Sequence, residues 1–161
     1  MRQVKLDRDF KSSESDKMEA PQTAALTNLA VGWGSMAIGA LTGLVLGLWS
    51  FGGPVSVPDL LGEYDTLPRR LMRLGHIAFF GLGILNILMA VHLGRLKSRD
   101  RHAKLALSAM NFGNIFLPLT LISAAFFEPL KYLMSLPATA VAVALIIAAR
   151  VAIRAARKEQ G

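Results

Sequence analysis

His76 is the residue of this sequence whose type and position best suit redox chemistry, because it lies inside a long apolar segment. Phe80 and Gly83 follow it by one and two helical turns, so on a helix all three would share one face. Imidazole can ligate haem iron, and a glycine nearby leaves room for a flat ring. A b-type haem could then use His76 with Met134 as second axial ligand, because histidine–methionine ligation occurs in cytochromes.

Other roles for His76 remain open from the sequence alone. Neither of the other histidines, His92 and His102, is expected at the same depth, so a bis-histidine haem has no second ligand within the chain. His76 could instead line a quinone pocket near the outer face. A purely structural role is a hydrogen bond from the imidazole to Arg73, to Tyr64 or to a lipid headgroup.

Three asparagines form the second polar group inside apolar segments. Folding the sequence about a turn near residues 98–99 places Asn86 opposite Asn111, with Asn114 about one helical turn further along the same face. We therefore predict an amide contact of Asn86 with Asn111 or Asn114 near the middle of a membrane. Such a contact contributes about 0.6 kcal/mol on average to helix association. The alternative is that these amides line a ligand or quinone site.

A stripe of small residues marks the first apolar segment. Ser35, Gly39, Gly43 and Gly47 recur at four-residue spacing. On a helix they lie on one face and allow the backbone of a second helix to approach closely. The stripe predicts a packing face, either within the chain or against another subunit.

Four apolar stretches must position these residues. Aspartate, glutamate, lysine and arginine are absent between 19 and 59, 73 and 95, 104 and 128, and 131 and 150. About 20 mostly apolar residues cross a membrane as a helix. The sequence therefore predicts an all-α membrane protein, a four-transmembrane-helix bundle, with helices at about 23–50, 71–93, 103–127 and 130–153. A polar cytoplasmic tail, 1–22, would precede the helical domain, 23–156, and a basic tail, 157–161, would follow it.

The basic residues predict how the bundle is oriented. If four helices alternate, fourteen of the 18 lysines and arginines lie on one side and four on the other. The rich side is cytoplasmic by the positive-inside rule, which places both termini inside. The outer side then contains a discordant basic group of Arg69, Arg70 and Arg73. Candidate partners are the acidic residues of the preceding loop, anionic lipids or another protein; the acids are Asp59, Glu63 and Asp65.

Several functions are disfavoured by what the sequence contains. The net charge of +7 comes from residues that flank apolar runs, which argues against nucleic-acid binding, and the absence of cysteine excludes disulfides and thiolate metal sites. Phosphate-loop and common hydrolase motifs are absent. We therefore expect a non-enzymatic subunit or accessory protein of a complex in a bacterial inner membrane, with other membrane subunits or a second copy as partner. A haem or quinone redox protein is the first alternative, and a small transporter or channel is the second.

Overall fold

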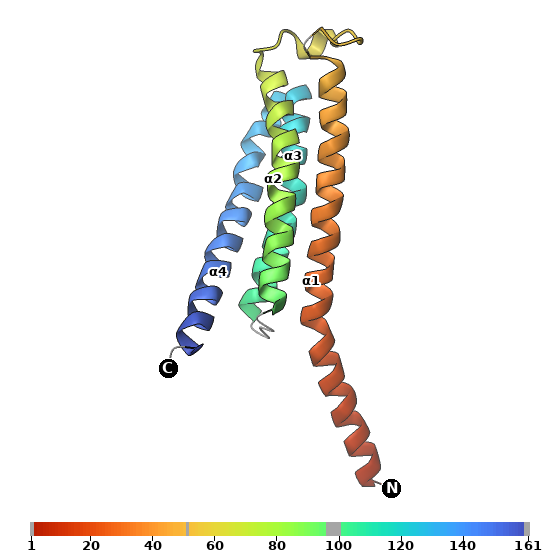
Figure 1. Cartoon of the computed structure of the whole chain (residues 1–161), viewed down its shortest axis with the longest axis vertical. Coiled ribbons are helices and arrows are strands. Elements are labelled where there is room, and N and C mark those ends of the chain that lie inside the picture. Colours follow the sequence, from red (N-terminus) through yellow and green to blue (C-terminus); the bar gives the residue numbers. More distant parts are fainter. Residues whose placement is uncertain (1, 51, 96–100, 160–161) are drawn as a thin grey trace.

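The computed structural model describes the backbone of residues 2–50, 52–95 and 101–159, and the side chains of residues 23–50, 52–95 and 101–158. Within these ranges helices are the only regular secondary structure, as the sequence predicts, and there is no strand (Figure 1). The long helices are α1 (Arg2–Leu48), α2 (Leu67–Arg95), α3 (Arg101–Phe126) and α4 (Ser135–Glu159). Two short 3-10 helices, η1 (Asp59–Leu61) and η2 (Glu128–Met134), lie between them.

The four apolar segments predicted from the sequence form helices that are long and apolar enough to cross a membrane. In the described part of the chain these candidate spans are Thr23–Leu48, Leu67–Arg95, Arg101–Phe126 and Glu128–Lys158. Most of their large apolar side chains are exposed on the outside of the molecule, Trp33, Leu41 and Ile146 among them. Exposed apolar faces of this extent suit a hydrocarbon environment.

Several boundaries differ from the expected ones: α2 begins at Leu67 rather than near 71, and α4 ends at Glu159 rather than near 153. The polar segment 1–22 is helical from Arg2 and continues directly into the apolar part of α1. At the other end, the last long helix begins at Ser135 because residues 128–134 form the tighter 3-10 turn of η2. Pro129 is the second residue of η2 and Pro137 lies in the first turn of α4, positions where a missing N–H costs little. The predicted basic turn at residues 96–100 lies outside the described residues.

The helices form a three-helix core with a fourth helix at one side. α1, α2 and α3 pack against one another, whereas α4 packs mainly on α3. Figure 1 shows α4 on the side away from α1 and both chain termini at the same end of the molecule. The loop between α1 and α2 lies at the opposite end, which we call the loop end.

Small residues allow the helices to approach closely. Ala90, Ala106 and Ala144, from α2, α3 and α4, are at most 1% exposed in the core cluster near the terminal end. α1 and α2 cross at Gly32 and Gly83, where a Cβ built on Gly83 would lie 2.8 Å from the Gly32 carbonyl oxygen. A larger residue at this crossing would meet backbone, which cannot rotate away.

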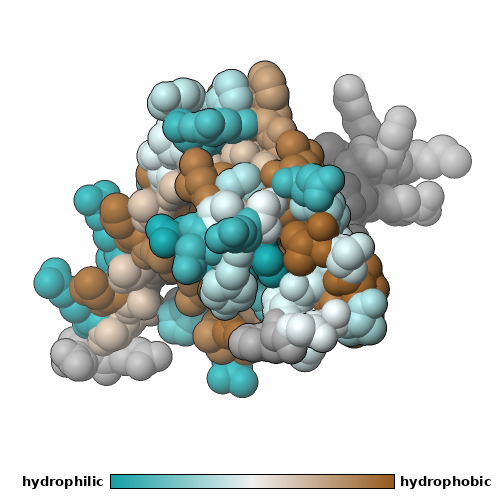
Figure 2. Space-filling view, turned by 90° about the horizontal axis from the view of Figure 1, so that it is seen from above, coloured by the Kyte–Doolittle hydropathy of each residue, from teal (hydrophilic) through white to brown (hydrophobic). Residues whose placement is uncertain are grey.

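The loop end closes over a second core cluster. Leu61 of η1 is 1% exposed and packs with Leu71 and Met72 of α2 and with Ala124 and Ala125 of α3. Figure 2, which looks onto this end, shows hydrophilic side chains interspersed with hydrophobic ones. The loop therefore anchors itself through one leucine while leaving charged groups on the surface.

Candidate functional site

The polar side chains inside the helical core form a series along the interface of α1, α2 and α3, which we call the polar seam. Its members on α1 recur every seven residues, so they stay on one face of the helix. The seam consists of Asn28, Ser35 and Thr42 of α1, His76 and Asn86 of α2, and Asn111 and Asn114 of α3.

At the end of the seam nearer the termini, three asparagines form a closed ring of hydrogen bonds. Asn28 Nδ2 donates to Asn86 Oδ1 (2.5 Å), Asn86 Nδ2 to Asn111 Oδ1 (2.8 Å), and Asn111 Nδ2 to Asn28 Oδ1 (2.9 Å). The second N–H of Asn28 reaches the Leu107 carbonyl at 2.9 Å. Each amide thus donates to one neighbour and accepts from the other, and one ring ties three helices together.

This asparagine ring satisfies polar groups that would otherwise be costly in an apolar interior. Asn28 and Asn86 are 1% and 0% exposed. A carboxamide has both donor and acceptor atoms, so three of them can close a ring without any outside partner. The structure thus brings Asn86 and Asn111 together, as the hairpin geometry predicts, and adds Asn28 from α1.

The middle level of the seam joins Ser35 of α1 to the other two helices. Ser35 Oγ lies 2.9 Å from the Phe79 carbonyl oxygen of α2 and 2.9 Å from Asn114 Oδ1 of α3. Ser35 is 6% exposed and Asn114 is fully buried. Asn114 is therefore separated from the asparagine ring and belongs to this level instead.

At the end of the seam nearer the loop end, His76 forms a hydrogen bond with the backbone of α1. Its Nδ1 lies 2.8 Å from the Gly39 carbonyl oxygen, and because a carbonyl only accepts, this nitrogen carries the proton. Thr42 Oγ1 donates to the same carbonyl at 2.9 Å. The imidazole also meets Phe80 edge to face, with ring centroids 5.4 Å apart. His76 thus contacts α1, rather than the candidate partners Arg73 and Tyr64.

α1 lies directly against one side of the His76 ring. A Cβ built on Gly43 would lie 2.5 Å from His76 Cε1, and one built on Gly83 would meet the Gly32 carbonyl. Phe80 packs over Gly39. Met134 instead packs against the cluster at the loop end, next to α3. The described residues also contain no group of three histidine, aspartate or glutamate side chains that could hold a metal ion.

The glycine stripe of α1 faces α2 over most of its length. Positions 35, 39 and 43 contact α2 at Phe79, Phe80 and His76 respectively. Gly47 differs, because a Cβ there would meet nothing within 4 Å. Three members of the predicted stripe therefore form an intramolecular packing face, and the fourth lies beyond it.

Two arginines at the loop end, Arg69 and Arg73, form hydrogen bonds with neutral backbone carbonyls. Arg69, only 7% exposed, donates from Nη2 to the Trp49 carbonyl oxygen at 3.1 Å, just beyond the end of α1. Arg73 donates from Nη1 to the Tyr64 carbonyl at 3.0 Å and lies 4.1 Å from the centroid of the Tyr64 ring. Within the described residues, neither guanidinium forms an ion pair with Asp59, Glu63 or Asp65; the ion pair found there joins Lys131 to Glu128.

Arg69 has a clear electrostatic role in this position. A helix carries partial negative charge at its C-terminus, where the last carbonyls lack helical partners, and a cation there is stabilising. α1 ends at Leu48, and Arg69 approaches the carbonyl of the next residue. The arginine therefore ties the start of α2 to the end of α1.

Comparison with known proteins adds no assignment. No protein-family model, curated protein or solved structure matches this chain. The function must therefore be argued from the seam and the surfaces of the chain itself.

Sequence reasoning missed the parts that Asn28 and Ser35 play as hydrogen-bonding residues. The available signal was the seven-residue spacing of Asn28, Ser35 and Thr42 within an apolar helix. That spacing places polar groups on one face, next to the glycine stripe.

Proposed function

We propose that this chain is an integral protein of a bacterial cytoplasmic membrane and serves as a non-enzymatic subunit or accessory protein of a membrane complex. The observation that carries the proposal is how the seam uses its polar groups. The asparagine ring, Ser35 and His76 bond to one another or to helix backbone, so their chemistry holds helices together.

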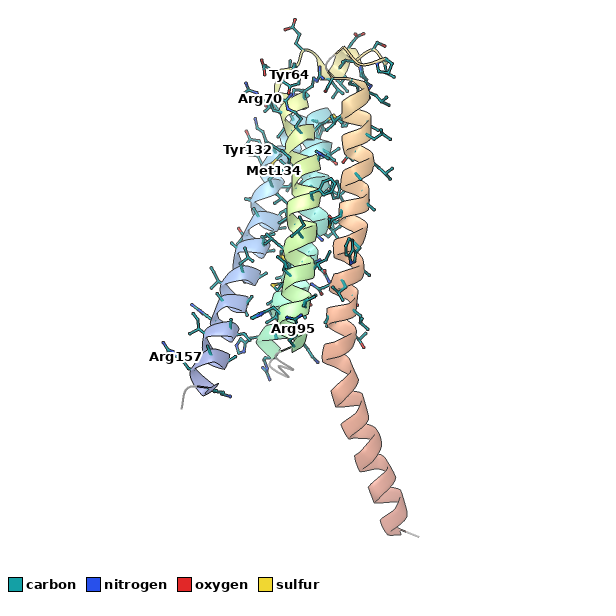
Figure 3. All side chains as sticks on the ribbon, in the orientation of Figure 1. Tyr64, Arg70, Arg95, Tyr132, Met134 and Arg157 are labelled. Atoms are coloured by element: carbon teal, nitrogen blue, oxygen red, sulfur yellow. The ribbon has the colours of Figure 1, made fainter. Side chains whose placement is uncertain are left out.

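Membrane insertion with both termini in the cytoplasm agrees with the placement of the basic residues. Figure 3 places Arg95 and Arg157 at the end where the chain termini lie, and Tyr64 and Arg70 at the loop end. The terminal end also receives the basic residues of the N-terminal segment. This asymmetry is the one that keeps a polytopic protein in a single orientation.

A role within a complex is supported by the open side of α4. This helix packs mainly on α3 and exposes several large apolar side chains. The exposed large side chains of this surface are Leu136, Val143, Leu145, Ile146 and Ile153. We propose that another membrane subunit covers it.

The proposal is tested by purifying the tagged chain from its native membrane in mild detergent and measuring the mass of the particle. We expect a defined particle containing a second polypeptide in fixed stoichiometry. A photo-crosslinking residue at Ile146, on the exposed side of α4, should join the two chains. The same residue at Ala144, which is fully buried, should not. A monomer that carries only lipid, with no crosslink from Ile146, would refute the subunit role.

The redox alternative has a separate test. His76 remains the residue that it would use, but the contacts of His76 with Gly39 and Gly43 occupy the side of the ring facing α1. A Soret band in the purified complex that is lost in His76→Ala, while the complex keeps its mass, would favour this alternative over the proposal.

A further inference from the structure

One amide in the polar seam has no protein partner for one of its polar atoms. Asn114 is fully buried, and its Nδ2 has no hydrogen-bond acceptor among the described residues. All other buried side-chain nitrogen and oxygen atoms in that part of the chain have at least one partner. A buried amide nitrogen without an acceptor costs free energy, so native structures rarely keep one without a bound water or other group to satisfy it.

Turning the amide over does not remove the problem. Ser35 Oγ has a single hydrogen but lies 2.9 Å from two acceptors, the Phe79 carbonyl and Asn114 Oδ1. With the Asn114 amide reversed, Nδ2 would donate to Ser35 Oγ, which would donate to the carbonyl. These two hydrogen bonds are consistent with each other, yet they leave Asn114 Oδ1 in the position without a partner. Amide orientation is assigned from such networks, so both cases must be considered.

We infer that Asn114 binds one water molecule in the interior of the helical core, between α1, α2 and α3. Water suits either orientation of the amide, because it can accept from Nδ2 or donate to Oδ1. A larger ligand does not suit a residue that is fully buried. The inference goes beyond the proposed function and concerns the chain whichever complex it joins.

The backbone of the same residue offers one further group that a buried water could bind. Pro118 has no N–H, so the backbone carbonyl of Asn114, four residues earlier, lacks its usual helical donor. Pro118 is itself fully buried within α3. Ordered water is one of the means by which a proline-interrupted membrane helix satisfies the freed carbonyl.

The chain offers an unusually clean test because it has four asparagines, three in the ring and Asn114. Side-chain ¹⁵N labelling of asparagine gives four amide signals in the full chain reconstituted into lipid bilayers. Magnetisation transferred from water protons in solid-state NMR then reports which amides contact water. The Asn114 signal is identified by its loss in Asn114→Leu, and retention of the three ring signals in that variant shows that it still folds.

We expect transfer to the Asn114 amide to build up several-fold faster than transfer to the ring amides. It should persist in Ser35→Ala, which removes a neighbour but not the water. Slow transfer to all four amides would overturn the inference, because Asn114 would then be dry. Equally fast transfer to all four would also overturn it, because water would then enter the whole core.

Discussion

The two ends of the α1–α2 interface are held together by different kinds of hydrogen bond. Near the termini, Asn28 and Asn86 join Asn111 in a ring of side chains. Towards the loop end, His76 and Arg69 each donate to a backbone carbonyl at or near α1. In the ring, every amide depends on the other two. At the loop end, each contact can be lost without leaving the next one unpaired, so we expect the ring to fail as a unit and the outer contacts to fail separately.

Replacing one member of the ring should have the largest effect on stability. Asn86→Leu removes two ring hydrogen bonds and leaves one N–H of Asn28 and the Oδ1 of Asn111 without a partner. We expect it to lower the free energy of unfolding by about 2 kcal/mol, near the upper end of what interhelical hydrogen bonds contribute in membranes. Unfolding by steric trapping in bicelles would measure this change.

The cooperativity of the ring provides the control. A triple variant, Asn28→Leu with Asn86→Leu and Asn111→Leu, leaves no ring amide buried without its partner. Its loss of stability should be smaller than the sum of the three single losses, because removing both partners of a buried hydrogen bond costs less than removing one. Three strictly additive losses would show that the amides act independently, and the contrast between the two ends would disappear.

Disturbing the close packing between Gly43 and His76 should have the next largest effect on stability. In Gly43→Ala the added methyl would lie 2.5 Å from His76 Cε1, so the imidazole must shift away from α1. We expect a loss of about 1 kcal/mol, at the low end for overpacking because a side chain rather than backbone has to move. Gly47→Ala is the matched control: it lies on the same helix, one turn away, with nothing within 4 Å, and should change stability little. Equal effects of the two substitutions would mean that helix propensity, not contact with His76, sets the outcome.

The sequence predicts the contact between α2 and α3 in the asparagine ring better than the contact of either helix with α1. Only residues 96–100 separate α2 from α3 in the sequence, so counting back from them fixes the depth of Asn86 relative to Asn111. α1 is connected to α2 by a long loop with several prolines, so no count fixes which residue of α1 meets Asn86. For this reason the pairing of Asn28 with Asn86 could not be foreseen, although the seven-residue spacing placed Asn28 on a polar face of its helix.

The outer arginines show a second limit of sequence reasoning. Charge pairing made the acidic loop residues natural partners for Arg69 and Arg73. In the structure both arginines instead bind backbone carbonyls, one of them at the end of α1. Carbonyl acceptors carry no sequence signature, because every residue has one. The four apolar helices were predictable, since length and hydrophobicity alone define them.

Replacing Arg69 at the loop end should cause a smaller loss of stability. Arg69→Met keeps an apolar stem but removes the cation near the C-terminus of α1. We expect a loss of about 0.5 kcal/mol, typical of a charge at a helix end, and it should shrink as salt is added. Arg70→Met is the control, because Arg70 is exposed on the next position of α2. If Arg69→Met were as damaging as Asn86→Leu, the loop end would be as interdependent as the ring.

Ser35→Ala should have the smallest effect and tests the level between the two ends. The Phe79 carbonyl lies within α2 and keeps its helical donor when the serine hydroxyl is removed. Asn114 loses a neighbour, but a bound water can take the place of the hydroxyl hydrogen bond. We therefore expect a loss smaller than that of Arg69→Met and below the average of about 0.6 kcal/mol for one interhelical hydrogen bond. A loss as large as that of Asn86→Leu, measured in the same bicelles, would mean that Asn114 depends on Ser35 as strictly as the ring amides depend on one another. The closed network would then extend from the ring to the middle of the seam.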